Sequence, residues 1–338
     1  MTMVRTLATA GVEDRDSNAG RRPARRLRGA LLAAGAAVAL ALTACVPVTN
    51  APPGGGAVVT GTYRIGPFNL AAMGQPGWQS NASTTGVPRP PGSFGIKSID
   101  FDIVDAAGTP VNPHDVHLHH VLLVDQSKPD YLCPGRGQRF AGAGMERTPL
   151  RLDDPYAVLV GASDRWDSLW HIMNMSDTAR TVYIQYKVGY QPGADASNTR
   201  GVVPFFMDIT GCGNSEYDVP GNGGPGSVHT KSKTWSAPFD GIAVYAGGHI
   251  HAGGIDITLS DPNVGLQCTM TAEYMDMGMG TMAADDDGLG MLERIPPCKM
   301  HNVVVKGKPY TVTARYHNDQ PVEGAMGIVL NYVWPGHQ

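Results

Sequence analysis

Short runs of apolar and β-branched residues recur along the chain from residue 62 onward, separated by turn-forming glycine and proline. Such runs are typical of β-strands. Polar and apolar residues alternate most clearly at 181–188, which predicts a strand with one buried and one solvent-facing side. No helix of ten residues is predicted after residue 45. The expected strands are 98–104, 116–124, 157–161, 168–174, 181–190, 241–247, 254–260, 266–273, 301–306, 310–316 and 326–333.

This pattern predicts an all-β fold. The 43 glycines and 26 prolines are scattered between the strands, as in turn-rich β proteins. The roughly 290 residues that follow residue 45 exceed what a single core usually holds, so we expect two domains. The economical arrangement is two tandem antiparallel β-sandwich domains, jelly-roll-like, at 61–218 and 236–338. A Gly/Pro/Asn-rich stretch marks 219–235 as the expected linker.

The first 45 residues have the pattern of an export signal. Arginines at 21–28 precede a short apolar stretch at 29–41, which is too short to span a bilayer. The stretch ends in Leu-Thr-Ala-Cys at Cys45, which resembles the lipobox of bacterial lipoproteins. That resemblance implies cleavage before Cys45, lipidation of its thiol and attachment to the cell surface, with 46–60 as a flexible tether. The alternative is a plain secretory signal with a chance cysteine.

Charge and cysteine content narrow the function classes. The formal net charge is −4, only 17% of residues are charged, and no basic run follows the signal, so nucleic acid is disfavoured as a partner. The four cysteines after Cys45 have no CxxC spacing, so a thiolate metal site is disfavoured. In an exported chain they predict two disulfides, with three possible connectivities. Local pairing gives Cys133–Cys212 and Cys268–Cys298.

Histidines stand in apolar strands where valine or isoleucine would be expected. His249 and His251 are two residues apart, so they point to the same face of a strand and can chelate one ion. Flanking pairs of glycine permit close approach or a bulge. The alternative is an exposed strand face with two surface histidines. Neutral imidazole suits zinc, copper, iron or nickel.

A second histidine cluster lies in an earlier apolar strand. His119 and His120 point to opposite sides of an ideal strand, so joint binding needs a local twist or a site lying across the strand end. His117 beside them leaves open which two would bind. His171 is a lone histidine in an apolar run, which is more often a core residue. Met326 alone would suggest packing, but a thioether next to a two-histidine site selects Cu(I).

These residues together resemble a known family. Paired histidines, a lone histidine, a later His-x-His and a C-terminal methionine occur in this order in the copper type II, ascorbate-dependent monooxygenases, which include peptidylglycine α-hydroxylating and dopamine β-monooxygenase. The match spans 98–335. The resemblance implies two β-sandwich domains with one copper ion each. It assigns one copper to His119, His120 and His171, and the oxygen-binding copper to His249, His251 and Met326.

The resemblance also implies the chemistry. It predicts hydroxylation of a C–H bond by O2, with ascorbate or another one-electron reductant, and a solvent-filled cleft between the two coppers. The family's carboxylate-binding positions correspond here to Gly247, Ile328 and Leu330, which offer a carboxylate neither charge nor hydrogen bond. Peptidylglycine is therefore disfavoured, and a more apolar small-molecule substrate is expected.

Two further features bear on function. A methionine-rich run at 270–282 supports the alternative of a lipid-anchored copper-binding or copper-trafficking protein without catalysis, although closely spaced methionines are more often adaptable packing. The stretch from Tyr316 to Tyr332 resembles the end of a plant stress- and nodulation-induced family. That family's chemistry is not implied by the resemblance.

Overall fold

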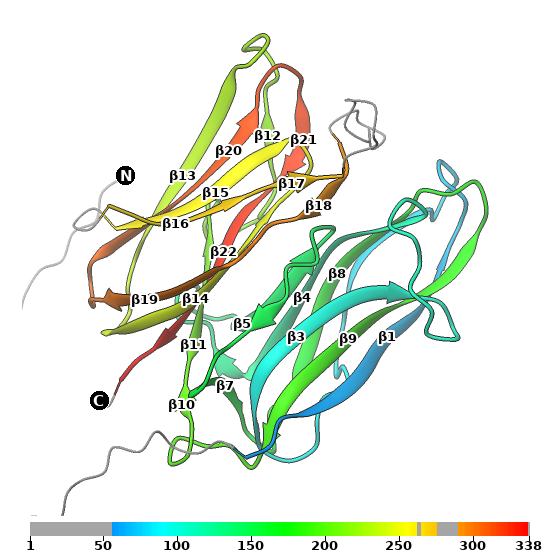
Figure 1. Ribbon diagram of the computed structural model, residues 1–338. Coiled ribbons are helices and arrows are strands. Elements are labelled where there is room, and N and C mark those ends of the chain that lie inside the picture. The colour runs from blue at the N-terminus through cyan, green and yellow to red at the C-terminus, as the bar shows by residue number, and fades with distance from the viewer. Residues whose placement is uncertain (1–55, 262–264, 276–289, 337–338) are drawn as a thin grey trace, which may run out of the picture. The chain divides into compact units, whose positions relative to one another are not determined.

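The computed structural model describes residues 56–261, 265–275 and 290–336, and in these ranges the chain is all β without a helix (Figure 1). The all-β prediction is therefore confirmed. No element in the described ranges is a helix with the length and apolar character needed to cross a bilayer. The expected export signal at 1–45, including Cys45, and the expected tether up to residue 55 lie outside the described residues.

Two sheets form from strands that precede residue 202. Sheet I has the order β1 (Val59–Leu70), β9 (Arg180–Pro192), β3 (Phe94–Val104), β7 (Tyr156–Val160) and β10 (Arg200–Gly201), and β6 (Leu150–Arg151) also pairs with β3. Sheet II has the order β2 (Gln79–Thr84), β8 (Trp166–Asn174), β4 (Val116–Pro129) and β5 (Gly137–Gly144). All pairings are antiparallel except that of β7 with β10.

Two more sheets follow, and both are antiparallel. Sheet III has the order β11 (Val203–Asp208), β22 (Gly327–Trp334), β14 (Gly241–Ile250) and β19 (Cys298–Val304). Sheet IV has the order β13 (Val228–Ser236), β20 (Pro309–His317), β15 (Gly254–Asp261) and β16 (Gly265–Thr271). Short ladders join β12 (Tyr217–Val219) to β21 (Val322–Ala325), and β17 (Glu273–Tyr274) to β18 (Leu292–Arg294).

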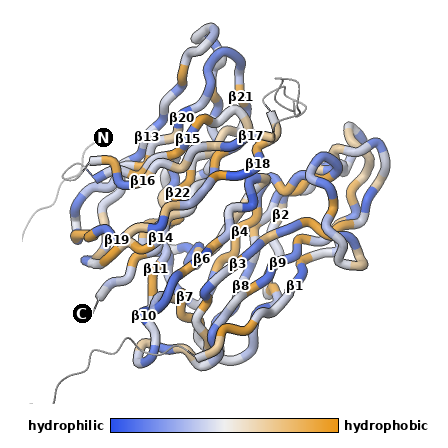
Figure 2. Tube along the Cα trace, viewed as in Figure 1, coloured by the Kyte–Doolittle hydropathy of each residue, from blue (hydrophilic) through white to orange (hydrophobic). Residues whose placement is uncertain are grey.

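Sheet III is buried on both faces, and this property organises the core. Along β22, Ile328, Leu330 and Tyr332 pack into a first core with the apolar residues of sheets I and II. The alternate residues Val329 and Val333 pack into a second core with sheet IV. Successive side chains of a strand point to opposite faces, so one strand supplies both cores. Figure 2 shows the corresponding mixture of apolar and polar positions along the strands.

The predicted division into two jelly-roll domains is wrong. Four sheets pack in succession, in the manner of four propeller blades, and the described residues belong to one unit. The physical reason is the two-sided burial of sheet III, which makes apolar packing continuous from sheet II to sheet IV. Alternating patterns in sequence show that a strand is buried on one face or two, but they do not show which sheets share a core.

The expected linker coincides partly with a strand. The chain leaves sheet I after Gly201 and enters sheet III at Val203, ahead of the segment 219–235. Part of that segment belongs to β13 (Val228–Ser236). No finding tests 218 and 236 as domain boundaries, which stay a prediction.

Both predicted disulfides are present. Cys133 is bonded to Cys212, and Cys268 to Cys298. The first bridge joins the loop between β4 and β5 in sheet II to the segment after β11 in sheet III. It therefore ties two different sheets together, whereas the sequence analysis placed both cysteines in one expected domain, 61–218.

A candidate metal centre

The strand pair β4–β8 places three of the predicted histidines together. His120 lies opposite His171, and the β4–β8 register shifts between Leu118 and His120. This irregularity is the local departure from ideal geometry that joint use of His119 and His120 requires. The Nδ1 atoms of His119 and His120 are 3.3 Å apart. Possible ligand atoms of His119, His120 and His171 all lie within 4.8 Å of one another, so these residues could hold a metal ion.

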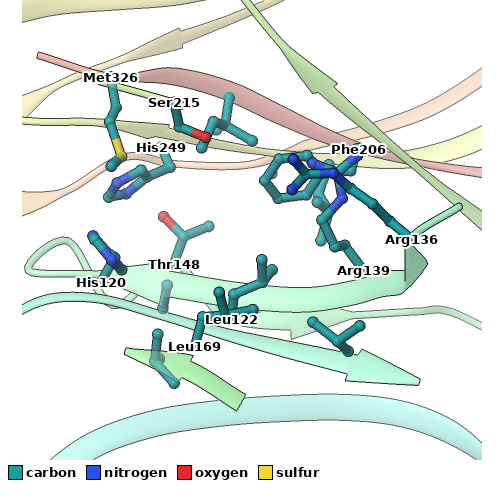
Figure 3. Close-up of a pocket in the computed structure, with 18 of the residues that line it drawn as sticks. His120, Leu122, Arg136, Arg139, Thr148, Leu169, Phe206, Ser215, His249 and Met326 are labelled. Carbon is teal, nitrogen blue, oxygen red and sulfur yellow. The ribbon is translucent and has the colours of Figure 1, made fainter. Parts of the chain in front are cut away.

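The end of β14 carries the other predicted pair. The ring centroids of His249 and His251 are 5.0 Å apart. His249 lies opposite Ile328 of β22, which brings it close to Met326, the residue just before that strand. Figure 3 shows the Met326 sulfur turned toward the His249 ring. The structure thus brings together all six residues that the resemblance assigned as ligands, and their roles as ligands stay a prediction.

The two histidine sets lie in contact with one another. The ring centroids of His119 and His251 are 4.1 Å apart, and the rings of His120 and His251 lie 6.5 Å apart and nearly parallel. The solvent-filled cleft expected from the family resemblance is therefore absent between these rings. The reason is the packing of sheet II on sheet III, which presses the histidine-bearing strands β4 and β14 together.

Burial favours the neutral form of four of these imidazoles, those of His119, His120, His171 and His251. Desolvation, reinforced by neighbouring imidazoles, lowers the pKa of His119 to about 2 and that of His120 to about 3. Burial also lowers the pKa of His171, and it places the pKa of His251 well below its ordinary value. A neutral imidazole has a free lone pair, so near neutral pH these rings are in the form that binds metal.

Three buried ring nitrogens have no hydrogen-bond partner among the described residues: His171 Nδ1, His249 Nε2 and His251 Nε2. Leaving a buried polar atom unpaired costs about 1–3 kcal/mol, so such atoms in a cluster call for a ligand. Imidazole nitrogens beside a thioether form a donor set suited to copper. The residues present therefore fit a copper centre.

Buried partners hold the His-x-His segment in place. The Tyr316 hydroxyl accepts a hydrogen bond from the His251 backbone N–H at 2.8 Å and donates one to the Met326 carbonyl at 2.6 Å. His251 Nδ1 donates to the Gly324 carbonyl at 2.7 Å, which leaves its Nε2 free. Tyr316 thus fixes His251 and Met326 relative to each other. The sequence analysis did not identify this role, because a tyrosine in a strand has no distinguishing pattern.

Glu146 and Gly144 were also missed. Glu146 is 2% exposed and its Oε1 lies 3.0 Å from His249 Nδ1. Gly144 lets the chain pass close to the cluster, because an added Cβ would lie 2.5 Å from His249 Cε1 and 2.8 Å from the His119 carbonyl oxygen. Neither residue belongs to a motif, and only a glycine within a strand offers a weak signal of close approach.

Two cavities adjoin the cluster. The larger has a volume of about 550 Å³ and is lined at one end by His120, His249 and Met326 (Figure 3). The positions singled out from the resemblance, Gly247, Ile328 and Leu330, line it as well. The smaller, of about 150 Å³, contacts His119 and His251, and its walls include three methionines, Met145, Met173 and Met175.

Only part of the methionine-rich run at 270–282 lies within the described residues. Met270 is fully buried in the second core, so it serves packing. Met277, Met279 and Met282 lie outside the described residues.

Comparison with known proteins gives three kinds of match. Residues 171–334 match the family model described as Stress up-regulated Nod 19, which agrees with the resemblance predicted for Tyr316–Tyr332. A protein of Phoma sp. named probable copper-dependent oxygenase M1 is 27% identical over 238 residues, which cover 65% of this chain and 58% of that protein. A protein of Cochliobolus lunatus named probable copper-dependent oxygenase clz3 is 26% identical over 238 residues, covering 65% of this chain and 72% of that protein.

These matches support a copper-oxygenase-like family. The chain spans little more than half the length of the Phoma relative, so the activity of the whole protein is a matter for proposal. The narrower resemblance to the ascorbate-dependent monooxygenases stays a prediction.

Solved structures resemble the chain only distantly. Two structures of peptide N-glycanases, one titled peptide-N(4)-(N-acetyl-β-D-glucosaminyl) asparagine amidase and the other recombinant peptide:N-glycanase F, align with TM-scores of 0.44 and 0.39. Their sequence identities are 12% and 11%; the alignments cover 81% and 80% of this chain, and 96% and 95% of theirs. Likeness at this level carries no argument about function.

Proposed function

We propose that this protein is a copper- and O2-dependent monooxygenase that hydroxylates a C–H bond of a small, largely apolar substrate. One observation carries the proposal: five imidazoles and one thioether cluster together, and His120, His249 and Met326 of this cluster line one end of a cavity of about 550 Å³. Among the described residues, three of the imidazole nitrogens are buried without a partner. The names of the two fungal relatives point to the same chemistry.

The six side chains divide into the two donor sets of the family resemblance. His119, His120 and His171 would hold one copper ion, and His249, His251 and Met326 the other. When bound, copper would supply the one-electron redox chemistry that activates O2, with the thioether favouring Cu(I). Contact between the rings of His119 and His251 supports a shared centre for two neighbouring ions.

The surrounding residues position the donors and exclude water. Glu146 and the Gly324 carbonyl hold the Nδ1–H of His249 and His251, so that both Nε2 atoms are available to the metal. The substrate carbon would lie in the cavity beside His249 and Met326, where the walls include Ile328 and Leu330. Apolar walls limit the access of water, which protects reactive species from side reactions.

The overall reaction is balanced by an external reductant. One C–H bond becomes C–OH with one oxygen atom of O2, and the other oxygen atom leaves as water, which consumes two electrons and two protons. Ascorbate or another one-electron reductant would supply the electrons. We also propose an extracytoplasmic location with a lipid anchor at Cys45; two disulfides support an oxidising compartment.

The test combines metal analysis with product analysis. The copper-loaded full chain, reduced with ascorbate, is supplied with isotopically labelled O2 and a panel of apolar substrates. We expect oxygen uptake coupled to a product that carries the label, and no labelled product from the His249→Ala/His251→Ala variant. If copper binds but no product carries the label with any substrate, the copper-binding or trafficking alternative becomes the better account.

A further inference from the structure

The larger cavity has two chemically different ends. One end carries His120, His249 and Met326, and the other carries the guanidinium groups of Arg136 and Arg139 (Figure 3). Arg139 lies near Phe206, which pairs with Leu330, and Met326 is four residues before Leu330 along the chain. At ~3.3 Å per strand residue, the two ends are therefore about 13 Å apart.

Arg139 is a built-in donor at the far end. Its side chain is 7% exposed, its Nε donates to Asp130 Oδ2 at 2.7 Å, and its guanidinium carbon lies 3.9 Å from the centre of the Phe206 ring. These contacts fix the orientation of the planar group. Its Nη2 is buried and has no hydrogen-bond partner among the described residues. A buried N–H of a cation without an acceptor is costly, so its presence in a cavity wall points to a ligand.

Arg136 adds a charge at the same end. It is exposed at the cavity edge, and its side chain forms no hydrogen bond or ion pair with the described residues. Asp130 already neutralises Arg139, and burial raises the pKa of nearby Asp208, which favours its neutral form. Glu216, another acidic residue of the lining, lies 3.9 Å from the position of an added Cβ on Gly324, near the metal end. The arginine end therefore keeps a net positive charge.

The walls between the two ends are mainly apolar. Tyr245 and Tyr332 also line the cavity, but their hydroxyls donate to the backbone carbonyls of Pro149 and Phe140. Leu169 is 46% exposed although it is a large apolar residue, and it lies in this lining. An apolar ligand in the cavity would contact this side chain and remove it from water. Leu122, Leu150, Phe206, Ile328 and Leu330 are further large apolar side chains of the lining.

We propose that the substrate is an elongated apolar molecule with a carboxylate at one end, which Arg136 and Arg139 bind while the opposite end reaches His249 and Met326. A carboxylate accepts two parallel N–H bonds from arginine and balances the charge of Arg136. This inference rests on the proposed function for the identity of the reacting end. The sequence analysis expected no carboxylate-binding site, because Gly247, Ile328 and Leu330 offer a carboxylate neither charge nor hydrogen bond. The inference revises that expectation, because it places the carboxylate site elsewhere in the same cavity.

The experiment measures binding, not turnover. Dodecanoate, dodecanol and dodecylamine share one apolar chain and differ in the head group, and their affinities for the full chain are compared by calorimetry. Measurements with and without copper separate recognition by arginine from direct coordination of the carboxylate. Loss of oxygenase activity would leave this binding unchanged, so failure of the proposed function and failure of this inference are distinguishable.

We expect dodecanoate to bind most tightly, with and without copper. Arg136→Met should lower the affinity for dodecanoate by about tenfold, the loss expected for one charge-assisted hydrogen bond. It should leave the affinity for dodecanol unchanged. Arg139→Lys keeps the charge next to Asp130, and it should also lower the affinity for dodecanoate without lowering that for dodecanol. Arg165→Met, an exposed arginine outside the cavity lining, is the matched control.

Three results would overturn the inference. The first is equal affinity for dodecanoate and dodecanol in the unmodified protein. The second is a preference for dodecanoate that depends on copper. The third is a loss of affinity for dodecanol as large as the loss of affinity for dodecanoate in both arginine variants.

Discussion

Glu146 Oε1 accepts a hydrogen bond from His249 Nδ1 at 3.0 Å, in a contact between the segment after β5 and strand β14. The same carboxylate oxygen accepts the backbone N–H of Gly144 at 2.8 Å. Because the carboxylate accepts, His249 carries its proton on Nδ1 and presents the lone pair of Nε2, which is buried and unpartnered. A carboxylate behind a histidine ligand fixes the tautomer and ring orientation and makes the imidazole a stronger donor.

Replacing Glu146 should therefore weaken copper binding without removing a ligand. In Glu146→Gln we expect copper affinity to fall by about ten- to a hundredfold, the usual effect of losing such a partner. Affinity is measured by competition with a chelator, and the Cu(II) EPR spectrum should also change. Glu293→Gln, an exposed glutamate, is the control. Unchanged affinity and spectrum in Glu146→Gln would show that the contact is only structural.

Met326 should be the sulfur donor in the reduced protein. X-ray absorption of the Cu(I) form should show a sulfur scatterer that disappears in Met326→His, because this thioether lies beside His249 (Figure 3). Met173→Leu is an informative control, since Met173 lines the smaller cavity next to His119 and His251. A sulfur signal that survives Met326→His and disappears in Met173→Leu would place the soft donor on the opposite side of the cluster.

The contact between the two histidine sets predicts magnetic interaction. Copper titration should saturate near two equivalents, since each set offers three donors. Two Cu(II) ions held by rings as close as those of His119 and His251 should couple, so the EPR-detected copper should fall short of the total. His171→Ala should disturb the first set and restore a full-intensity signal from the second. Full intensity with two ions bound would indicate separate sites.

The ligand candidates could be predicted from sequence because imidazoles are rare in apolar strands. His119, His120 and His171 were recognised from that contrast and from their order along the chain. Joint use of His119 and His120 was expected to need a local twist or a site across the strand end, and the structure has a register shift between Leu118 and His120. Their contact with His251 could not be predicted, because it depends on how β4 and β14 pack across two sheets. The arginine end of the cavity was missed for the same reason: neither Arg136 nor Arg139 is near the histidines in sequence.

Some strands of the fold could be predicted from the sequence and others could not. Strands with strong alternation or long apolar runs were predicted, such as β9 and β22. Strands with polar surfaces, such as β2 and β13, were not, because most of their side chains are exposed. The predicted arrangement of sheets was wrong because β22 contributes side chains to two cores. The continuous apolar run of this strand in the sequence does not reveal which sheet packs on each of its faces.

The buried imidazoles should make the copper-free protein sensitive to acid. The folded protein has a pKa of about 2 for His119 and about 3 for His120, below the ordinary value of 6.5. Between these values and 6.5 the unfolded chain binds more protons than the folded chain. The stability present above pH 6.5 is therefore lost as the pH falls through this window.

Thermal melting of the copper-free protein from neutral pH to about pH 5 measures this effect. We expect the decline in melting temperature to be shallower in His119→Gln/His120→Gln than in the unmodified protein, whatever the absolute stability of the variant. An equal or steeper decline in the variant would show that other groups govern the acid response.

The two disulfides should contribute similarly to stability but differently to ligand binding. They close loops with sequence separations of 79 and 30 residues, and the loop-entropy model assigns each about 4 kcal/mol. Cys133–Cys212 connects the segment that carries Arg136 and Arg139 to residues 213–216, which line the same cavity. Cys268–Cys298 lies in the second half of the chain, and neither cysteine lines that cavity.

We therefore expect both double Cys→Ser variants to melt at lower temperature, while only Cys133→Ser/Cys212→Ser also loses affinity for dodecanoate. The physical reason is that loosening the β4–β5 loop moves Arg136 away from the opposite wall, whereas loosening β16 from β19 leaves the cavity unchanged. The second variant serves as the matched control for lost stability without lost geometry. Equal dodecanoate affinity in the two variants, measured well below both melting temperatures, would mean that the first bridge stabilises the fold without shaping the cavity.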